Sequence, residues 1–380
     1  EYETRLLEAW ATRQGPDIFA VPNTWMGKYN DKMVPMPDAV SLARKVSGGG
    51  FGSKETIQTI SERTLGPIGV RNAFVDQVVR DAMAPGVDGK QAVYALPISF
   101  DVLALYYNRD LLNRAGITAP PATWEEFLTA VRKLTTYDAK GDIALAGAAL
   151  GRAENVERAT DILTLLMLQN GTMMTDERSG VKFNDRLSNG YEPGLRALTF
   201  YTDFANPAKE VYSWNEKFSG SIAALAEGKV AMAFGYAWHM PLIKARAPQL
   251  QIAVASVPQL PPNPSINLAN YWLNGVSFQS AHADIAWDVI QTLVRREHVE
   301  SYLTATKRPA ALRALIDVQV QDQDLAPFAS GILTAQSWYH GKNPLAMEAA
   351  FRTMIDGANK GEAKFVDLLN FAAAQVARTL

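Results

Sequence analysis

Short apolar runs alternate along the chain with stretches in which apolar residues recur every three to four positions. The clearest case begins with Val93–Ser99 and Val102–Tyr107, two runs typical of buried strands. Asn108 follows and can cap a short helix. In Trp124–Leu134 the apolar residues share one helical face. This alternation of strands and helices predicts an α/β fold.

The same region carries clear helix boundaries. Gly116 is expected to end the short helix after Asn108, because glycine readily adopts the left-handed conformation at a helix end. Pro120-Pro121 excludes helix. Thr123 and Glu126 then have the spacing of a capping box, which starts the next helix.

The remaining chain is interpreted in the same way. Strands are predicted at Asp17–Val21, Ile143–Leu150, Val181–Asn184, Lys229–Phe234 and Gln251–Val257. Helices are predicted at Tyr2–Arg13, Lys54–Thr64, Asn72–Met83, Ala159–Gln169, Glu192–Phe204, Ser219–Ala226, Ala283–Arg296, Ala346–Ile355 and Ala363–Ala377. In the helix at 283–296, Ile285, Val289 and Leu293 are expected to form the buried face.

The segment Ser47–Ser53, SGGGFGS, is rich in glycine and is similar to a phosphate-binding loop in that respect alone. It lacks the Lys-Ser/Thr pair that ends a P-loop, and it does not follow a clear strand. The sequence therefore predicts a flexible surface loop here.

Length and composition narrow the class of protein. A chain of 380 residues is too long for one typical core and suits two lobes. Hydrophobic content of 48% and charged content of 20% are typical of a globular protein. The net charge of -2 gives no reason to expect nucleic acid as a partner. No apolar stretch approaches the ~20 residues of a spanning helix.

Catalytic and metal-binding motifs are absent from the sequence. The chain has no cysteine, which excludes disulfides and thiol catalysis. The histidines are His239, His282, His298 and His340. None lies three to five residues from another, so no metal site and no cofactor are expected. A hydrolase using a pair of carboxylates such as Asp101 and Glu154 stays open, but nothing in the sequence demands one, and we expect no enzyme.

The tryptophans fall into two groups. Trp10, Trp124 and Trp287 lie on apolar helix faces and are expected in the core. The others lie in loops or at element ends, namely Trp25, Trp214, Trp238, Trp272 and Trp338. Tyr236, Tyr271 and Tyr339 adjoin three of these. Because a sugar ring offers both an apolar face and hydroxyl groups, loop aromatics beside polar side chains favour a carbohydrate ligand.

Four segments resemble, in order, one known family. They are GPDIFAVPNTW at Gly15–Trp25, LPISFDVLALYYNRDLLNRAGI followed by APPATWEEF, the stretch Phe183–Phe204, and FSGSIAALAEGKVAMAFGYAW at Phe218–Trp238. They are similar to the extracellular solute-binding proteins of ABC transporters, in the maltose-binding-protein-like group. The resemblance covers nearly the whole chain. It implies a two-lobed periplasmic-binding-protein-like fold, with a mixed sheet flanked by helices in each lobe and a cleft between the lobes.

The resemblance also implies where each lobe lies in the sequence. Lobe one is expected at 1–101 and 262–306, and lobe two at 102–261 and 307–380. The chain is expected to cross between them near 99–103, 257–264 and 306–309. Because the chain opens in a helix, the first strands of lobe one are expected to be missing from it.

The family pattern places ligand-binding residues in the loops that follow strands. The residues expected to bind ligand are Asn23, Trp25, Phe100, Asp101, Arg152, Asn155, Trp214, Tyr236, Trp238, Tyr271, Trp272 and Trp338. Metal-binding and catalytic residues are not expected.

The function that the resemblance implies is capture of a carbohydrate by hinge closure and its delivery to an ABC transporter permease. The protein is expected to be a monomer outside the cytoplasm, periplasmic or anchored as a lipoprotein. A phosphorylated polyol is an alternative ligand, with Arg152, Lys307 and Arg308 as candidate cations. Another small polar solute, or a role as a ligand-sensing domain, also stays open.

Overall fold

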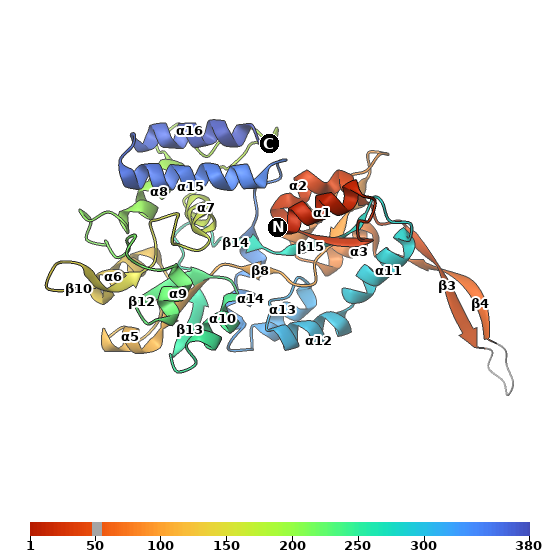
Figure 1. Ribbon diagram of the computed structural model, residues 1–380, viewed down its shortest axis with the longest axis horizontal. Coiled ribbons are helices and arrows are strands. Elements are labelled where there is room, and N and C mark those ends of the chain that lie inside the picture. Colours follow the sequence, from red (N-terminus) through yellow and green to blue (C-terminus); the bar gives the residue numbers. More distant parts are fainter. Residues whose placement is uncertain (48–54) are drawn as a thin grey trace. The chain divides into compact units, whose positions relative to one another are not determined.

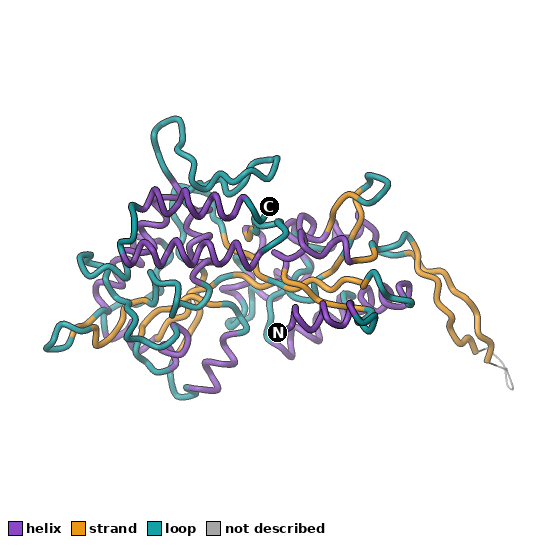
Figure 2. Tube along the Cα trace, turned by 45° about the horizontal axis from the view of Figure 1, so that its top comes forward, coloured by secondary structure: helices purple, strands orange, loops and turns teal. Residues whose placement is uncertain are grey.

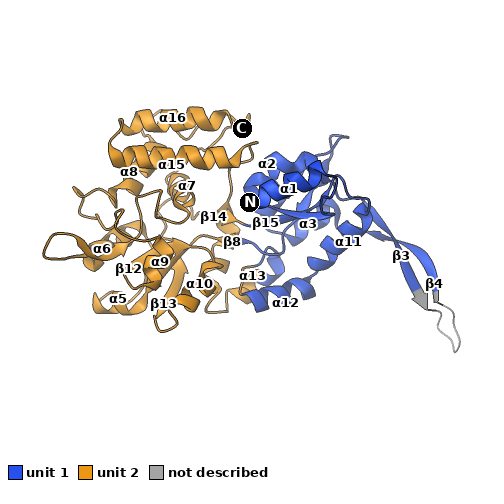
Figure 3. Ribbon diagram, in the orientation of Figure 1, with its two compact units in different colours: residues 1–100, 271–306, 310–315 blue, residues 101–270, 307–309, 316–380 orange. Residues whose placement is uncertain are grey.

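The computed structural model describes residues 1–47 and 55–380. A surface loop was predicted at Ser47–Ser53, and all of that segment except Ser47 lies outside the described residues. The chain divides into two compact units, coloured blue and orange in Figure 3. Unit 1 comprises Glu1–Phe100, Tyr271–Thr306 and Ala310–Leu315. Unit 2 comprises Asp101–Asn270, Lys307–Pro309 and Ile316–Leu380.

Asp101 and two longer segments lie in the other unit than the one predicted from the sequence. Residues 262–270, expected in lobe one, lie in unit 2, where β14 (Asn267–Asn270) pairs with β8 (Asp101–Val102). Residues 310–315, expected in lobe two, lie in unit 1, where the backbone of Ala311 accepts a hydrogen bond from Val75. Long-range strand pairing and loop packing decide both assignments, and neither is visible in local sequence.

The sheet of unit 1 is built around β15 (Trp272–Ser277). Its partners are β1 (Ile18–Pro22), β2 (Met33–Val34) and β7 (Ala95–Leu96), and every one of these pairings is antiparallel. Val21 lies opposite Leu273, and both side chains are fully buried. The helices α1 (Tyr2–Ala11), α3 (Gly66–Ala73), α4 (Asp76–Ala82), α11 (Ala283–Leu293) and α12 (Arg296–Thr306) complete the unit, with β5 (Met83–Pro85) and β6 (Gln91–Val93).

A two-stranded ribbon replaces the helix predicted at Lys54–Thr64, and that prediction is wrong. The strands β3 (Ala39–Ser47) and β4 (Glu55–Arg63) pair antiparallel along their length. Figures 1 and 2 show the ribbon running out from the rest of unit 1. Four β-branched residues, Thr56, Ile57, Thr59 and Ile60, favour a strand over a helix in this stretch.

Two further helix predictions in unit 1 need correction. The helix expected at Asn72–Met83 is two helices, α3 and α4, separated at Phe74, whose backbone is extended. In α11 the residues expected to be buried, Ile285, Val289 and Leu293, are exposed. The opposite face is buried and holds Trp287, whose indole N–H donates to the Val34 carbonyl at 3.1 Å. Apolar residues of α11 lie on more than one face of the helix, so its sequence alone does not determine which face is buried.

Unit 2 contains the mixed sheet. Its strand order is β10 (Thr136–Tyr137), β11 (Ile143–Ala148), β12 (Val230–Gly235), β9 (Ala104–Asn108) and β13 (Ile252–Ser256). The neighbours β11 and β12 run parallel, and β9 runs antiparallel to both β12 and β13. A smaller sheet has the order β16 (Ala335–Gln336), β14 and β8. Because β11 and β12 are parallel, the loops that follow them leave the same edge of the sheet.

Helix boundaries in unit 2 follow the local signals closely. α6 (Trp124–Leu134) begins with the predicted capping box of Thr123 and Glu126, which is confirmed. Asn108 caps α5 (Arg109–Arg114) as predicted, accepting from two backbone N–H groups. α7 (Ala159–Gln169) has the predicted bounds, and α8 (Pro193–Asp203) lies within the predicted range. The strand predicted at Val181–Asn184 is wrong, since Val181 forms only an isolated bridge with Thr175.

The C-terminal helices α15 (Pro344–Lys360) and α16 (Phe365–Ala377) pack side by side (Figure 1). The shorter helices are α2 (Met26–Tyr29), α9 (Ser221–Ala226), α10 (His239–Arg246), α13 (Arg313–Gln319) and α14 (Ala326–Ala329). Single 3-10 turns lie at Asn23–Trp25, Asn30–Lys32 and Ile332–Thr334. In the described ranges, every helix is too short or too polar to cross a membrane.

Candidate functional site

A polar cluster lies at the start of α7 in unit 2. Arg158 precedes the helix with a left-handed backbone, φ 59°, and its Nη2 lies 2.7 Å from Asp161 Oδ2. The Tyr236 hydroxyl donates to the same oxygen at 2.6 Å. Asn270 Nδ2 approaches it at 3.4 Å. One carboxylate oxygen therefore holds together side chains from three separate segments.

This cluster keeps hydrogen-bonding capacity for a ligand. Within the described residues, Asp161 Oδ1 and Arg158 Nη1 have no hydrogen-bond partner. Both side chains remain partly exposed, at 14% for Asp161 and 30% for Arg158. The negative charge of Asp161 raises the pKa of Arg158, so the guanidinium stays charged. Burial raises the pKa of nearby Glu348 on α15, while the positive charge of Arg158 opposes that rise.

Aromatic rings lie beside the cluster, in the loop after β12. The rings of Tyr236 and Trp238 are nearly parallel, at 12°, with centroids 6.3 Å apart. Trp238 also stacks on His239 at 3.6 Å and is half-buried. The backbone N–H of Tyr236 donates to His239 Nδ1 at 2.9 Å, so Nε2 carries the ring proton and donates to Glu157 at 2.9 Å. That hydrogen bond lowers the pKa of Glu157. We call Arg158, Asp161, Tyr236, Trp238 and Asn270 the unit 2 cluster.

Asp101, on β8, is hydrogen-bonded to the backbone of the same loop. Its side chain is 4% exposed, and its Oδ1 accepts backbone hydrogen bonds from Val102 at 3.0 Å and Ala237 at 3.1 Å. Its Oδ2 is buried and has no hydrogen-bond partner among the described residues. Burial raises the pKa of Asp101 to about 7, although the positive charge of Arg308 opposes the shift. Asp101 therefore links β8 to the Trp238 loop.

In unit 1, predicted ligand residues lie in a buried network around Asp81. The Tyr271 hydroxyl donates to Asp81 Oδ2 at 2.6 Å, Gln77 Nε2 to Oδ1 at 2.7 Å, and Asn23 Nδ2 to Oδ2 at 3.3 Å. Burial, followed by the charge of Asp81, raises the pKa of Tyr271, which keeps the phenol protonated. Phe100 stacks on Tyr271, with centroids 4.4 Å apart. Asn23, Phe100 and Tyr271 are thus interior residues that fix the loop after β1 to β15.

Trp214 and Asn155 also have structural partners. Trp214 is fully buried, stacks on Phe218 at 4.5 Å and donates its indole N–H to Asn155 Oδ1 at 2.8 Å. The Asn155 amide in turn donates to the carbonyls of Asn215 and Phe218. The two predicted ligand residues therefore lie together, and they hold the segment at 214–218 in place.

Arg152 is engaged by acids on either side. Its Nη1 lies 3.2 Å from Glu216 and its Nη2 lies 3.2 Å from Glu154. Its Nε is buried and finds no acceptor within the described residues. The guanidinium is therefore largely satisfied within unit 2.

The remaining predicted tryptophans each pack against aromatic rings of their own unit. In unit 1, Trp25 is half-buried against Tyr29, with ring centroids 5.9 Å apart. Trp272 in the same unit is 46% exposed and meets Tyr2 edge-on. In unit 2, Trp338 is half-buried and packs against aromatic neighbours of the core. These three rings keep exposed surface that a ligand could use.

Arg158 and Asp161, the charged residues of the unit 2 cluster, were not predicted from the sequence. The sequence interpretation selected Arg152 and Asn155, whereas Arg158 and Asp161 bear the open hydrogen-bonding groups. A signal was present, because α7 was predicted to start at Ala159 and polar side chains at a helix start after a strand often face ligands. Asn270 was also missed, since only strand pairing brings it to α7.

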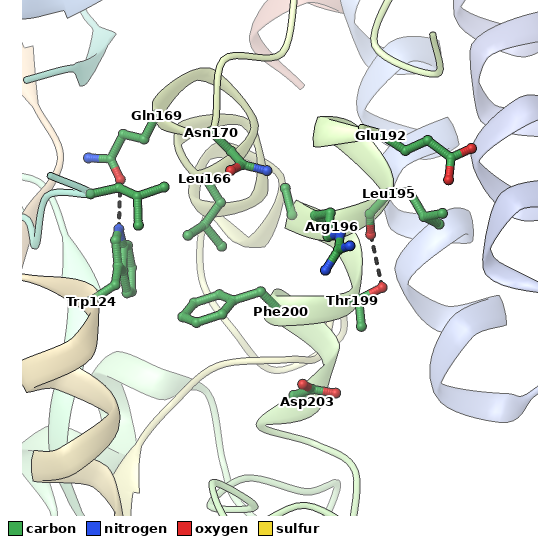
Figure 4. A pocket seen from close by; sticks show the side chains of 12 residues that line it. Trp124, Leu166, Gln169, Asn170, Glu192, Leu195, Arg196, Thr199, Phe200 and Asp203 are labelled. Carbon is green, nitrogen blue, oxygen red and sulfur yellow. Dashed lines mark hydrogen bonds between the residues drawn. The ribbon is translucent and has the colours of Figure 1, made fainter. Parts of the chain in front are cut away.

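A separate hollow of about 570 Å³ lies between α6, α7 and α8 in unit 2 (Figure 4). Leu166 and Phe200 contribute apolar walls. Its amides are occupied, because Gln169 accepts the indole N–H of Trp124 and Asn170 donates to the Pro193 carbonyl. Glu192 and Arg196 also line the hollow, and Arg196 lies over the Tyr191 ring at 5.7 Å. Within the described ranges, no group of three His, Asp or Glu side chains is placed to hold a metal.

The chain matches a known family over most of its length. The model of the family described as bacterial extracellular solute-binding protein matches residues 1–327. A protein of Brucella abortus (strain 2308), described as a binding protein, is 26% identical over 296 residues, or 74% of this chain. The chain spans 66% of the length of that relative.

Solved structures share the fold. A solute-binding protein of an ABC transporter from Thermotoga lettingae, bound with α-D-tagatose, has a TM-score of 0.69 at 20% identity, covering 99% of this chain and 88% of its own. A cyclo/maltodextrin-binding protein complexed with maltotetraose has a TM-score of 0.73 at 15% identity, covering 99% and 86%. The expected α/β fold of two-lobed solute-binding proteins is therefore confirmed, as is the family resemblance.

Proposed function

The chain belongs to the bacterial extracellular solute-binding protein family, and on that premise we propose that it captures a carbohydrate outside the cytoplasm and delivers it to an ABC transporter permease. The observation that carries the proposal is the unit 2 cluster. It combines a half-buried indole with a charged pair that has an open donor and an open acceptor.

The chemistry of this cluster suits a sugar. The aromatic ring of Trp238 can cover the apolar C–H face of a pyranose or furanose. Arg158 Nη1 can donate to a ring or hydroxyl oxygen, and Asp161 Oδ1 can accept from a hydroxyl. The Arg158–Asp161 ion pair and the Tyr236 hydrogen bond hold these groups in place before the ligand arrives. Recognition by paired donors and acceptors also rejects ligands that lack the matching hydroxyl.

Two neighbours in fold support a sugar as the ligand class. Their bound ligands are tagatose and maltotetraose, one a monosaccharide and the other an oligosaccharide. Capture by closure of two lobes on the ligand is the part of the proposal that rests on the family. The neighbours are binding proteins, so we propose that the sugar is released chemically unchanged.

Two of the three candidate cations for a phosphorylated polyol, Arg152 and Lys307, are already paired with carboxylates. Arg152 is paired with Glu154 and Glu216 at 3.2 Å each. Lys307 Nζ lies 3.2 Å from Asp322 Oδ2. A phosphate would have to displace these carboxylates, whereas the unit 2 cluster has open groups for a neutral ligand. The proposal therefore favours an uncharged sugar.

Thermal unfolding against a ligand panel tests the proposed function. The panel contains mono- and oligosaccharides, glycerol phosphates, amino acids and nucleosides. A ligand at ~100 times its dissociation constant should stabilise the folded state by about 2.7 kcal/mol and raise the melting temperature. We expect this shift with one class of neutral sugar. A shift produced only by phosphates or amino acids would contradict the proposal, as would conversion of the stabilising sugar.

A further inference from the structure

A second hollow, also of about 570 Å³, lies within unit 1 at the base of the β3–β4 ribbon. Four arginines line it, from β4, from the turn between α11 and α12, from the start of α12, and from α13. They are Arg63, Arg295, Arg296 and Arg313. We call this feature the arginine hollow. It has no residue in common with the unit 2 cluster and lies in the other unit.

The acids that line the arginine hollow are already paired. Glu62 and Asp288 both contact Arg44, at 2.9 Å and 3.7 Å from its Nη2. Arg313 pairs with Asp76 at 2.6 Å, outside the lining. Arg44 therefore neutralises much of the negative charge that would otherwise satisfy the lining arginines.

Arg63 and Arg295 are left with open guanidinium groups. Neither side chain has a hydrogen bond or an ion pair with any residue that the structure describes. Arg296 has only a long contact, 3.9 Å, with Glu300. Arginines that carry no carboxylate partner and face a common hollow are poised for bidentate contacts with carboxylate or phosphate oxygens.

The floor of the arginine hollow is apolar. Val40, Phe74, Val294 and Leu312 line it and are buried in unit 1. A concave surface with an apolar floor and convergent cations suits a compact anion on a small organic or inorganic scaffold. We propose that the arginine hollow binds a small anion carrying two or more carboxylate or phosphate groups.

Isothermal titration of the full chain with pyrophosphate, and separately with citrate, tests this proposal. Saturable binding of one anion per chain is expected with at least one probe. Arg63→Gln and Arg295→Gln should each weaken it roughly tenfold or more, because each removes a charge-assisted hydrogen-bond donor. The probe that binds more tightly identifies phosphate or carboxylate as the preferred group.

Arg71→Gln is the matched control, because Arg71 is exposed on α3 in the same unit and does not line the hollow. This control should bind the anion within about twofold of the unsubstituted protein. Melting temperatures of all variants should be unchanged, since the substituted guanidinium groups have no hydrogen-bond or ion-pair partner among residues 1–47 and 55–380. Absence of saturable binding with both probes, or equal weakening by Arg71→Gln, would overturn the proposal. The sugar panel is independent of this result.

Discussion

The free energy of unfolding of an Asp101→Asn variant should rise relative to that of the unsubstituted protein by up to about 4 kcal/mol between about pH 4 and about pH 8. Burial raises the pKa of Asp101 from 3.8 to about 7 in the folded protein. Ionisation of this carboxyl is therefore easier in the unfolded chain. Below pH 3.8 the carboxyl is protonated in both the folded and the unfolded protein, so its ionisation does not affect the free energy of unfolding. As the pH rises from 3.8 towards 7, ionisation in the unfolded chain progressively lowers the free energy of unfolding.

Urea unfolding at several pH values measures this effect. The asparagine oxygen can keep the two backbone hydrogen bonds that Oδ1 accepts, so the variant should fold. The quantity to compare is how the difference in free energy of unfolding between variant and unsubstituted protein changes with pH. Any effect of the amide that is the same at every pH cancels in this comparison. Asp110→Asn removes an exposed carboxylate in the first turn of α5 and is the control for loss of a surface charge, which should change the free energy of unfolding by less than about 1 kcal/mol. A flat difference for Asp101→Asn would contradict the assignment.

Replacing Asp81 with alanine should lower the free energy of unfolding by about 3 to 5 kcal/mol. The carboxylate accepts hydrogen bonds from three buried side chains, those of Asn23, Gln77 and Tyr271. Its removal leaves these donors buried without an acceptor, which costs more than the bonds themselves contribute. Chemical unfolding of unit 1, followed by a probe in that unit, measures the loss.

Two further variants separate the network from general effects of charge. Asp81→Asn keeps an acceptor oxygen and should lose less stability than the alanine variant. Asp31→Ala removes an exposed carboxylate of unit 1 that lies 3.0 Å from Lys32 Nζ, and it should change the free energy of unfolding by no more than about 0.5 kcal/mol. Equal losses in Asp81→Ala and Asp31→Ala would show that the buried network contributes nothing.

The sequence predicts best where local chemistry determines structure. The bounds of α7 and the capping box of Thr123 follow from short-range signals and are confirmed. The β3–β4 ribbon was missed because most of its described side chains are exposed and β4 lacks the apolar alternation of a half-buried strand. Val40 and Leu42 of β3 are buried, and pairing between the two strands stabilises the rest of the ribbon.

The candidate site could be predicted only in part. Its position follows from topology, because the loops after the parallel strands β11 and β12 meet at one edge of the sheet. The sequence singled out both loops, and Tyr236 and Trp238 do lie beside the charged pair. Which side chains keep open groups could not be predicted, because Asp161 and Tyr236 are 75 residues apart in sequence. Likewise, only the tertiary structure shows that Trp214 and Asn155 satisfy each other.

Binding of a neutral sugar by the unit 2 cluster can be measured by isothermal titration with the sugar that most raises the melting temperature. One site per chain is expected. Asp161→Ala and Trp238→Ala should each bind at least about tenfold more weakly, and Asp110→Ala should bind as the unsubstituted protein does. Undiminished sugar affinity in both cluster variants, with folding intact, would show that the unit 2 cluster is not the sugar site.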